Sequence, residues 1–312
     1  MLHNYYSVNT IKTLLGKTDT LMVLPYGSAC APSSTGIIAS GLSSLGHSVN
    51  EVWSIANTKI SRGTSGRCQW SKSAEILCVA TWITPDQCQN LAEATQLAYQ
   101  DLLTLLDQFD YQHPFRFWNY LPNINAGDND EEQYKKFCMG RLNAFKTKGV
   151  QPNEFPAASA LGHHSGGAVI YVIANRFPST HHKNALQLDA YEYPHEYGIS
   201  SPSFSRATSI TISTKPLFFI SGTASIIGHK TQHANNLEKQ VQTTIGNIQY
   251  LLEHANNHAL PLQSMKVYLR HAKDYSVAKK LLEKTFLSVP MLFTHADICR
   301  ADLLMEIECF CS

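Results

Sequence analysis

The apolar stretch ADICRADLLMEIECF, residues 296–310, carries two glutamates where a buried strand would be apolar. Side chains alternate between the two faces of a strand, so Glu306 and Glu308 share a face with Leu304 and Phe310. One interpretation is a half-solvated face. The other is a carboxyl group directed into a pocket, where it could act as an acid or a base.

A second candidate is an arginine within the apolar stripe of a predicted helix, EEQYKKFCMGRLNAF at residues 131–145. Arg141 lies seven residues after Tyr134 and four after Phe137, which places it on their side of the helix. It either extends along the rim to solvent or reaches inward, where it needs an anionic partner such as a ligand carboxylate. Gly140 is unfavourable inside a helix, which suggests that something approaches the backbone closely there.

Two predicted strands, RFWNY (116–120) and KVYLR (266–270), carry matching cationic and aromatic faces. The side chains that share these faces are Arg116, Trp118 and Tyr120 on the first strand and Lys266, Tyr268 and Arg270 on the second. They suit either an anionic ring ligand or an exposed face with long side chains, and we favour exposure for Arg116 and Lys266. A connector rich in Pro, Ser and Tyr adds Tyr197 and Arg206 on a shaped loop.

The elements that position these residues occur in the same order twice. A pattern of strand, helix, strand, helix, strand is predicted near residues 74–175 and again near 214–312, with 176–213 as the connector. Thr84 and Pro85 are suited to begin the first long helix as its N-cap and first residue. Residues 20–73 add strands and loops. The pattern predicts the α+β class, with sheets covered by helices on one side.

Composition excludes several classes of function. The chain has 312 residues, is 44% hydrophobic and carries a formal net charge of +1, so we expect a sizeable core and no nucleic-acid or acidic-membrane partner. Neither a secretion signal nor a membrane-spanning apolar run is evident. The 8 cysteines form no CxxC pair, which is typical of reduced thiols in a cytoplasmic protein.

Histidine pairs occur at 163–164, 181–182, 229/233 and 254/258, but none has a third ligand at a recognisable spacing. No glycine-rich phosphate-binding motif is present. The sequence therefore predicts neither a metal site nor a cofactor.

Several motifs carry a resemblance to known families. The second unit, with FISGTASI, MKVYL and LLMEIE, resembles the RidA/YjgF reactive-intermediate deaminases, but it has PMLFTH at 290–295, where that family carries a carboxylate-binding arginine. The whole chain is more similar to the chorismatases, which consist of two RidA-like units. The resembling motifs, over roughly residues 110–312, are FRFWNYLPNIN, EEQYKKFCMGRLNAF, YEYPHEYGISSPSFSRATSI, SGTASIIGH and ADICRADLLMEIE.

The resemblance implies two tandem RidA/YjgF-like (chorismate mutase-like) units, which we place at residues 1–190 and 191–312, and a monomer. It also implies cleavage of the enolpyruvyl ether of chorismate to pyruvate and a ring product. Protonation of the ether's methylene carbon needs a carboxylic acid that is neutral near pH 7, and apolar neighbours would keep Glu306 protonated. Glu308 is expected nearer the rim, in a supporting or solvated role.

The binding residues that follow from the resemblance are Arg141, Arg206 and Arg270 for the two carboxylates, with Tyr120, Tyr197, Gly222 and Ala224. Cys299 is either a small core residue or, as in the resembling family, a mark of the branch that forms 3-hydroxybenzoate, with 4-hydroxybenzoate as an additional product. The alternatives are hydrolysis of chorismate to a dihydroxy diene, a RidA-like enamine or imine hydrolase, and a non-catalytic small-molecule sensor.

Overall fold

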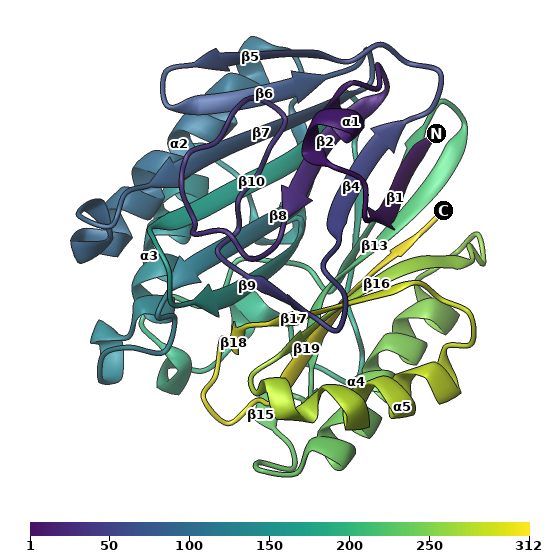
Figure 1. Cartoon of the computed structure of the whole chain (residues 1–312). Helices are drawn as coiled ribbons and strands as arrows, with labels where there is room; N and C mark the ends of the chain where they lie inside the picture. The colour runs from purple at the N-terminus through teal and green to yellow at the C-terminus, as the bar shows by residue number, and fades with distance from the viewer.

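The computed structural model describes residues 1–312 as two large sheets that face each other, with helices on their outer sides (Figure 1). The first sheet has seven strands, in the order β18 (Asp297–Ile298), β9 (Ala157–His163), β8 (His113–Pro122), β10 (Ala168–Asn175), β7 (Ile76–Ile83), β6 (Cys68–Lys72) and β5 (Ser61–Ser65). Helices α2 (Leu91–Gln108) and α3 (Gln133–Thr147) cover its outer face. Their apolar stripes, such as Ala98 and Leu102, pack there against Val79 and Val172.

The second sheet also has seven strands, in the order β11 (Thr180–His182), β12 (Ala207–Ile212), β13 (Lys215–Ala224), β19 (Met305–Cys311), β16 (Leu262–Leu269), β17 (Met291–His295) and β3 (Ser43–Leu45). Helices α4 (Leu237–His254) and α5 (Tyr275–Thr285) cover its outer face. Asn236 caps α4 by accepting a hydrogen bond from the backbone N–H of Lys239. Met305, Ile307 and Cys309 of β19 face these helices, so Glu306 and Glu308 face the first sheet.

The N-terminal residues form a third, smaller sheet at one end of the space between the two large ones (Figure 1). It consists of β1 (Leu2–Ser7), β4 (Asn50–Ile55) and β2 (Thr20–Pro25), with the short helix α1 (Ile11–Leu15) beside it. Trp53 of β4 packs against Trp118, Phe219 and Phe310, so this sheet completes the apolar interior.

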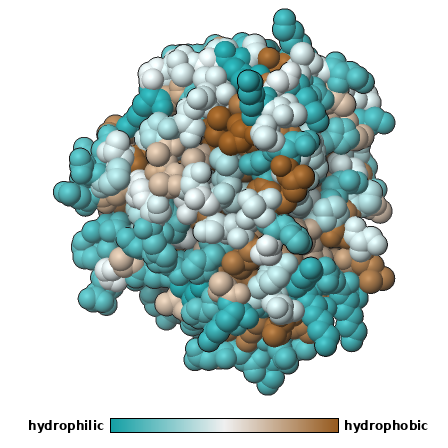
Figure 2. Space-filling view, viewed as in Figure 1, coloured by the Kyte–Doolittle hydropathy of each residue, from teal (hydrophilic) through white to brown (hydrophobic).

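Short elements complete the chain. The hairpin of β14 (Ile226–Ile227) and β15 (Lys230–Thr231) follows β13, and 3₁₀ turns span Gln87–Asn90, Asn129–Glu131, Pro152–Glu154, Ala190–Glu192, His195–Tyr197 and Ala272–Asp274. Thr84 accepts a hydrogen bond from the N–H of Gln87, but the prediction that it caps the long helix is wrong, because α2 begins at Leu91 with Asn90 as its N-cap. On the face seen in Figure 2, apolar residues form small separate groups among polar ones. No helix combines the length and apolar character that a membrane span needs.

The predicted α+β class is confirmed, including helices on one side of each sheet. Besides β1, β11 and β12, the prediction missed two strands, β9 after α3 and β17 after α5, which pair in parallel with β8 and β16. The sequence of β9, AASALGH, consists mainly of small residues, and that of β17, MLFTH, is short. Neither shows a clear alternation of apolar and polar residues. The closing strand begins at Met305, because residues 299–304 form a loop.

The two units also exchange strands. β3 pairs with β17 in the second sheet, and β18 pairs with β9 in the first. β11 lies before residue 190 but pairs with β12 in the second sheet. Both the boundary at residue 190 and the monomeric state stay predictions.

Candidate active site

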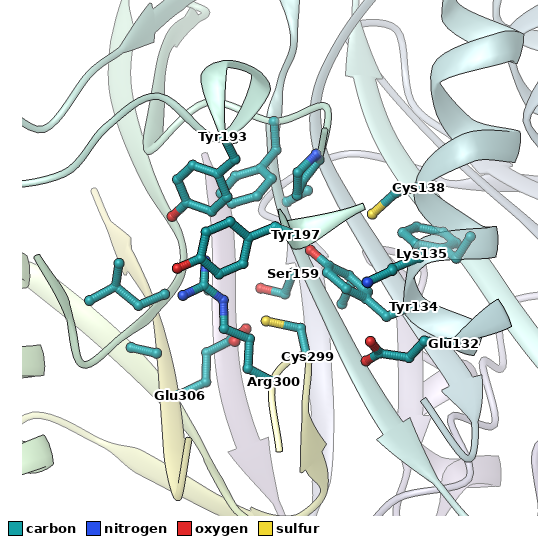
Figure 3. Close-up of a pocket in the computed structure, with 18 of the residues that line it drawn as sticks. Glu132, Tyr134, Lys135, Cys138, Ser159, Tyr193, Tyr197, Cys299, Arg300 and Glu306 are labelled. Carbon is teal, nitrogen blue, oxygen red and sulfur yellow. The ribbon is translucent and has the colours of Figure 1, made fainter. Parts of the chain in front are cut away.

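A cavity of about 330 Å³ lies where the two sheets meet, within the range of roughly 300–1,000 Å³ of small-ligand sites. Its walls come from α3 and β9 of the first unit, from the connector, and from β13, β19 and the β18–β19 loop of the second (Figure 3). The lining residues used below are Tyr134, Arg141, Ser159, Tyr193, Tyr197, Arg206, Gly222, Ala224, Cys299, Arg300 and Glu306. Neither unit alone encloses this space.

Glu306 faces the cavity from the N-terminal end of β19 and is only 4% exposed. Burial is the main reason that the pKa of its carboxyl is raised to about 8, and the negative charge of Glu308 adds to the effect, while Arg116 and Arg206 oppose it. Glu306 is therefore a neutral acid at pH 7, as the sequence predicts.

A β-bulge makes room for this carboxyl. Between the pairs Ile220–Cys309 and Thr223–Ile307, β13 has two residues where β19 has one. A Cβ atom on Gly222 would lie 1.9 Å from Oε1 of Glu306, so any other residue there would displace the carboxyl from this position. Gly222 and Ala224 both line the cavity, as predicted from the resemblance.

Arg141 reaches inward from α3 and is 2% exposed. Its Nε and Nη2 atoms are buried without a hydrogen-bond partner, and its guanidinium lies 5.4 Å from the ring centroid of Tyr99 and 5.7 Å from that of Phe117. An unpaired buried cation is costly, and an anionic ligand in the cavity would relieve that cost. The close approach to the backbone predicted at Gly140 is made by α2: a Cβ on Gly140 would lie 2.1 Å from the carbonyl oxygen of Ala92.

Two more arginines line the cavity. Arg206 donates to the carbonyl of Leu188 (2.5 Å) and to the hydroxyl of Tyr193 (2.9 Å), but its buried Nε has no partner.

Arg300, which the sequence did not single out, donates to the carbonyl of His229 (2.8 Å), and its Nη2 is unpartnered. Its guanidinium lies 4.0 Å from the ring centroid of Tyr197, and Figure 3 shows the two stacked above Glu306. The only sequence signal was its position directly after Cys299.

Cys299 lies in the loop before β19, and its thiol is near Glu306 in Figure 3. Burial, with a smaller contribution from Glu306, raises the pKa of this thiol to about 12. The side chain is therefore a neutral thiol and not a nucleophilic thiolate. Tyr134, predicted only as part of an apolar stripe, lines the cavity beside it.

The expectation of a rim position for Glu308 is wrong. Glu308 is buried in an ion cluster that we define as Glu51, Arg116, Lys266 and Glu308, between the two large sheets and the N-terminal sheet. Its carboxylate contacts Arg116 at 2.7 Å and Lys266 at 3.1 Å, and Lys266 also contacts Glu51 at 2.7 Å. Arg116 and Lys266 are 1% and 2% exposed, so the expectation of an exposed strand face is wrong as well.

Hydrogen bonds complete the ion cluster. The carboxylate of Glu308 accepts from Trp118 Nε1 (2.7 Å), Ser159 Oγ (2.6 Å) and Tyr268 Oη (2.9 Å). Burial by itself would raise the pKa of Glu308, but Lys266, Arg116 and the hydrogen bonds from Ser159 and Trp118 lower it to about 2. Ser159 also lines the cavity, so it lies between the ion cluster and the site of Glu306.

Two predicted binding residues lie outside the cavity. Tyr120 is fully buried in the contact between the sheets, where its hydroxyl lies 3.1 Å from that of Tyr268 and accepts from Lys266 (3.3 Å). Arg270 lies behind the cavity wall, where it donates to the carbonyl of Leu303 and pairs with Asp297 at 2.7 Å. Both predictions are corrected, since neither side chain reaches the ligand space.

Fold and cavity together define a two-unit α+β protein with a neutral carboxylic acid and three arginines around one small-ligand site. Residues 51–174 match the family model described as chorismatase FkbO/Hyg5-like, N-terminal. A 3-hydroxybenzoate synthase from Streptomyces hygroscopicus is 33% identical over 83% of this chain and 80% of that protein, and a chorismatase from Streptomyces rapamycinicus is 31% identical with the same coverage. A crystal structure of a chorismatase superposes with a TM-score of 0.89 at 25% identity, covering 100% of this chain and 98% of that one. The chain belongs to the chorismatase family.

Proposed function

We propose that this protein is a chorismatase that cleaves the enolpyruvyl ether of chorismate and releases pyruvate and 3-hydroxybenzoate. The observation that carries the proposal is a neutral glutamic acid, Glu306, in the same cavity as three arginines that each have a buried nitrogen without a protein acceptor. Chorismate is a small ring with two carboxylates and an acid-labile ether, so it matches both features. The relatives named for this chemistry support the same substrate.

In the proposed reaction, Arg141, Arg206 and Arg300 bind the two carboxylates as charge-assisted hydrogen-bond donors. The acid of Glu306 protonates the methylene carbon of the enolpyruvyl group, and positive charge develops at the ether carbon. The bond between the ring carbon and the ether oxygen then breaks, its electron pair stays on the oxygen, and pyruvate leaves.

The ring's own hydroxyl completes the proposed product. Its oxygen bonds to the ring carbon that pyruvate leaves, and its proton returns to Glu306. Opening of the original carbon–oxygen bond and loss of a ring proton then give 3-hydroxybenzoate. Opening of the new carbon–oxygen bond instead gives 4-hydroxybenzoate as an additional product. Hydroxybenzoate and pyruvate together contain all the atoms of chorismate, so neither water nor a cofactor is consumed.

Cys299 is proposed to favour this branch over hydrolysis. Hydrolysis needs a water beside the ether, and a neutral thiol is a weak hydrogen-bond partner for such a water. With a small apolar residue instead, water can enter, and part of the flux gives the non-aromatic dihydroxy diene.

The test is incubation of the purified protein with chorismate, an enzyme-coupled assay for pyruvate and chromatography of the ring products. Wild type is expected to give pyruvate and hydroxybenzoate, and Cys299→Ala is expected to divert part of the product to the diol. Cys88→Ala is the matched control, since Cys88 does not line the cavity. Absence of pyruvate would contradict chorismate cleavage. The diol as the sole wild-type product would contradict the hydroxybenzoate branch. Identical product mixtures from wild type and Cys299→Ala would mean that Cys299 only contributes to packing.

A further inference from the structure

Arg270 lies directly after β16, and every N–H donor of its guanidinium forms a hydrogen bond within the protein. It is 12% exposed at the side chain and does not line the cavity. A guanidinium has five N–H donors, and Arg270 makes five hydrogen bonds, through Nε, Nη1 and Nη2. It therefore has no donor left for a substrate.

Three of these hydrogen bonds go to backbone carbonyls of one loop. We call residues 298–303 the cavity loop; Arg270 donates to the carbonyls of Ile298 (2.9 Å), Arg300 (2.9 Å) and Leu303 (2.8 Å). The side-chain acceptors are Asp297 (2.7 Å), just before the loop, and Asn125 (3.1 Å). One planar group thus fixes the beginning, the middle and the end of the loop.

The cavity loop carries two of the groups that face the ligand space. Cys299 and Arg300 lie between the first two carbonyls that Arg270 holds, and both line the cavity. Gln240 of α4 holds the far end through the carbonyl of Asp302 and the N–H of Leu304, both at 2.8 Å, but it forms no hydrogen bond with residues 298–300. The position of the thiol therefore depends on Arg270.

We propose that Arg270 is a positioning residue that sets product specificity by holding the cavity loop, and with it the thiol of Cys299, against the space where a hydrolytic water would enter. The proposal rests on the proposed function for its chemistry. Lysine has three donors on a tetrahedral nitrogen and can pair with Asp297, but it cannot span three carbonyls in one plane. Arg270→Lys thus keeps the charge and removes the clamp.

Two measurements test this, and one of them is independent of catalysis. The first is the ratio of diol to hydroxybenzoate formed from chorismate. The second is the rate at which iodoacetamide labels Cys299 in the native protein, followed by peptide mass spectrometry. For Arg270→Lys we expect both to rise about tenfold, which corresponds to about 1.4 kcal/mol.

Arg176→Lys is the matched control, because Arg176 also pairs with an aspartate, Asp110, and a backbone carbonyl but lies outside the cavity wall. It should leave both quantities at wild-type values. Asp297→Asn loosens the same clamp more mildly and should change both in the same direction by less, which keeps the test decisive if Arg270→Lys fails to fold.

The proposal is overturned if a folded Arg270→Lys protein matches Arg176→Lys in both measurements. It is also overturned if labelling rises while the product ratio stays unchanged, since the loop would then have no influence on specificity. If wild type forms only the diol, the assigned product has failed, and the labelling rate alone decides whether Arg270 positions Cys299.

Discussion

The ion cluster and the cavity lie beside each other between the same two sheets, and each contains one glutamate of β19. The carboxylate of Glu308 accepts hydrogen bonds from Arg116, Trp118, Ser159 and Tyr268 and pairs with Lys266. Glu306 has no hydrogen-bonding partner that lowers its pKa. Glu306 and Glu308 are only two residues apart on one strand, yet Glu306 is a neutral acid and Glu308 is an anion.

The same contrast holds for the arginines. In the ion cluster, Arg116 contacts both Glu308 and Ser159, so its charge is compensated within the protein. In the cavity, the buried nitrogens of Arg141 find no acceptor. Burial with partners stabilises the fold, whereas burial without partners prepares a group for a ligand or for proton transfer.

The largest expected effect is the loss of turnover in Glu306→Gln. The amide has nearly the same shape but cannot deliver a proton, so we expect kcat to fall by about 10²–10⁴ while the protein keeps its stability. Steady-state kinetics and thermal unfolding measure the two quantities. A variant that keeps more than about a tenth of the wild-type rate would remove Glu306 from the role of general acid.

The same substitution two residues later should act on the fold. Glu308→Gln leaves Arg116 and Lys266 with too little negative charge in a buried site, so we expect a loss of about 3–5 kcal/mol in the free energy of unfolding, measured in urea. Glu283→Gln breaks an exposed pair with Lys279 and should change the same quantity by less than about 1 kcal/mol. Equal stabilities for these two variants would refute the structural role of the ion cluster.

Arg141→Ala should separate binding from stability. Hydrogen bonds to charged groups contribute about 1.5–3 kcal/mol, so chorismate should bind about tenfold more weakly or worse. Because the unpartnered buried charge is removed, the unliganded protein should be no less stable than wild type. Arg116→Ala should lower stability instead, and a similar loss in Arg141→Ala would mean that its charge is already compensated.

The smallest expected effect is the dependence on pH. Since the pKa of Glu306 is about 8, kcat/KM should fall about tenfold per pH unit above that value as the acid loses its proton. Its folded pKa is raised, so its contribution to stability is greatest below the usual 4.5 and is lost as pH rises through about 8. Glu308 acts in the opposite sense: its contribution is present above 4.5 and is lost as pH falls through about 2.

Unfolding measured from pH 4.5 to just above pH 8 tests the statement about the contribution of Glu306 to stability. Glu306→Gln should abolish the part of the decline in stability over this range that comes from this carboxyl. An unchanged decline in that variant would assign the titration to another group.

The sequence was sufficient for residues whose role follows from one local element. Glu306 follows from strand alternation in β19, and Arg141 from the stripe of α3. The prediction that Arg270 binds the ligand was wrong because β16 ends at Leu269. The alternation that places Lys266 and Tyr268 on one face therefore no longer applies to Arg270. Arg300 was not predicted as a cavity residue because it lies in a loop, where no periodicity of the sequence indicates which way a side chain points.

The ion cluster could not be predicted at all, because its partners are remote in the chain. Arg116 and Glu308 are 192 residues apart, and Glu51 lies outside the sequence motifs that carry the resemblance. Tyr120 lies on the predicted face of β8, but at this position the face packs against Tyr268 of the second sheet and does not line the cavity. Pairing across sheets is a property of the assembled fold and leaves no local pattern.

The pairing of remote strands also has a consequence during protein synthesis. The hydroxyl of Tyr6 in β1 donates to the carbonyl of Met265, 259 residues later, and β19 is the strand that joins β13 to β16. At about 5–20 residues per second, the ribosome takes on the order of ten to fifty seconds to cover such a distance. Until β19 emerges, β13 and β16 each present an unpaired edge, so we expect the nascent chain to need protection from association with its neighbours until β19 has been synthesised.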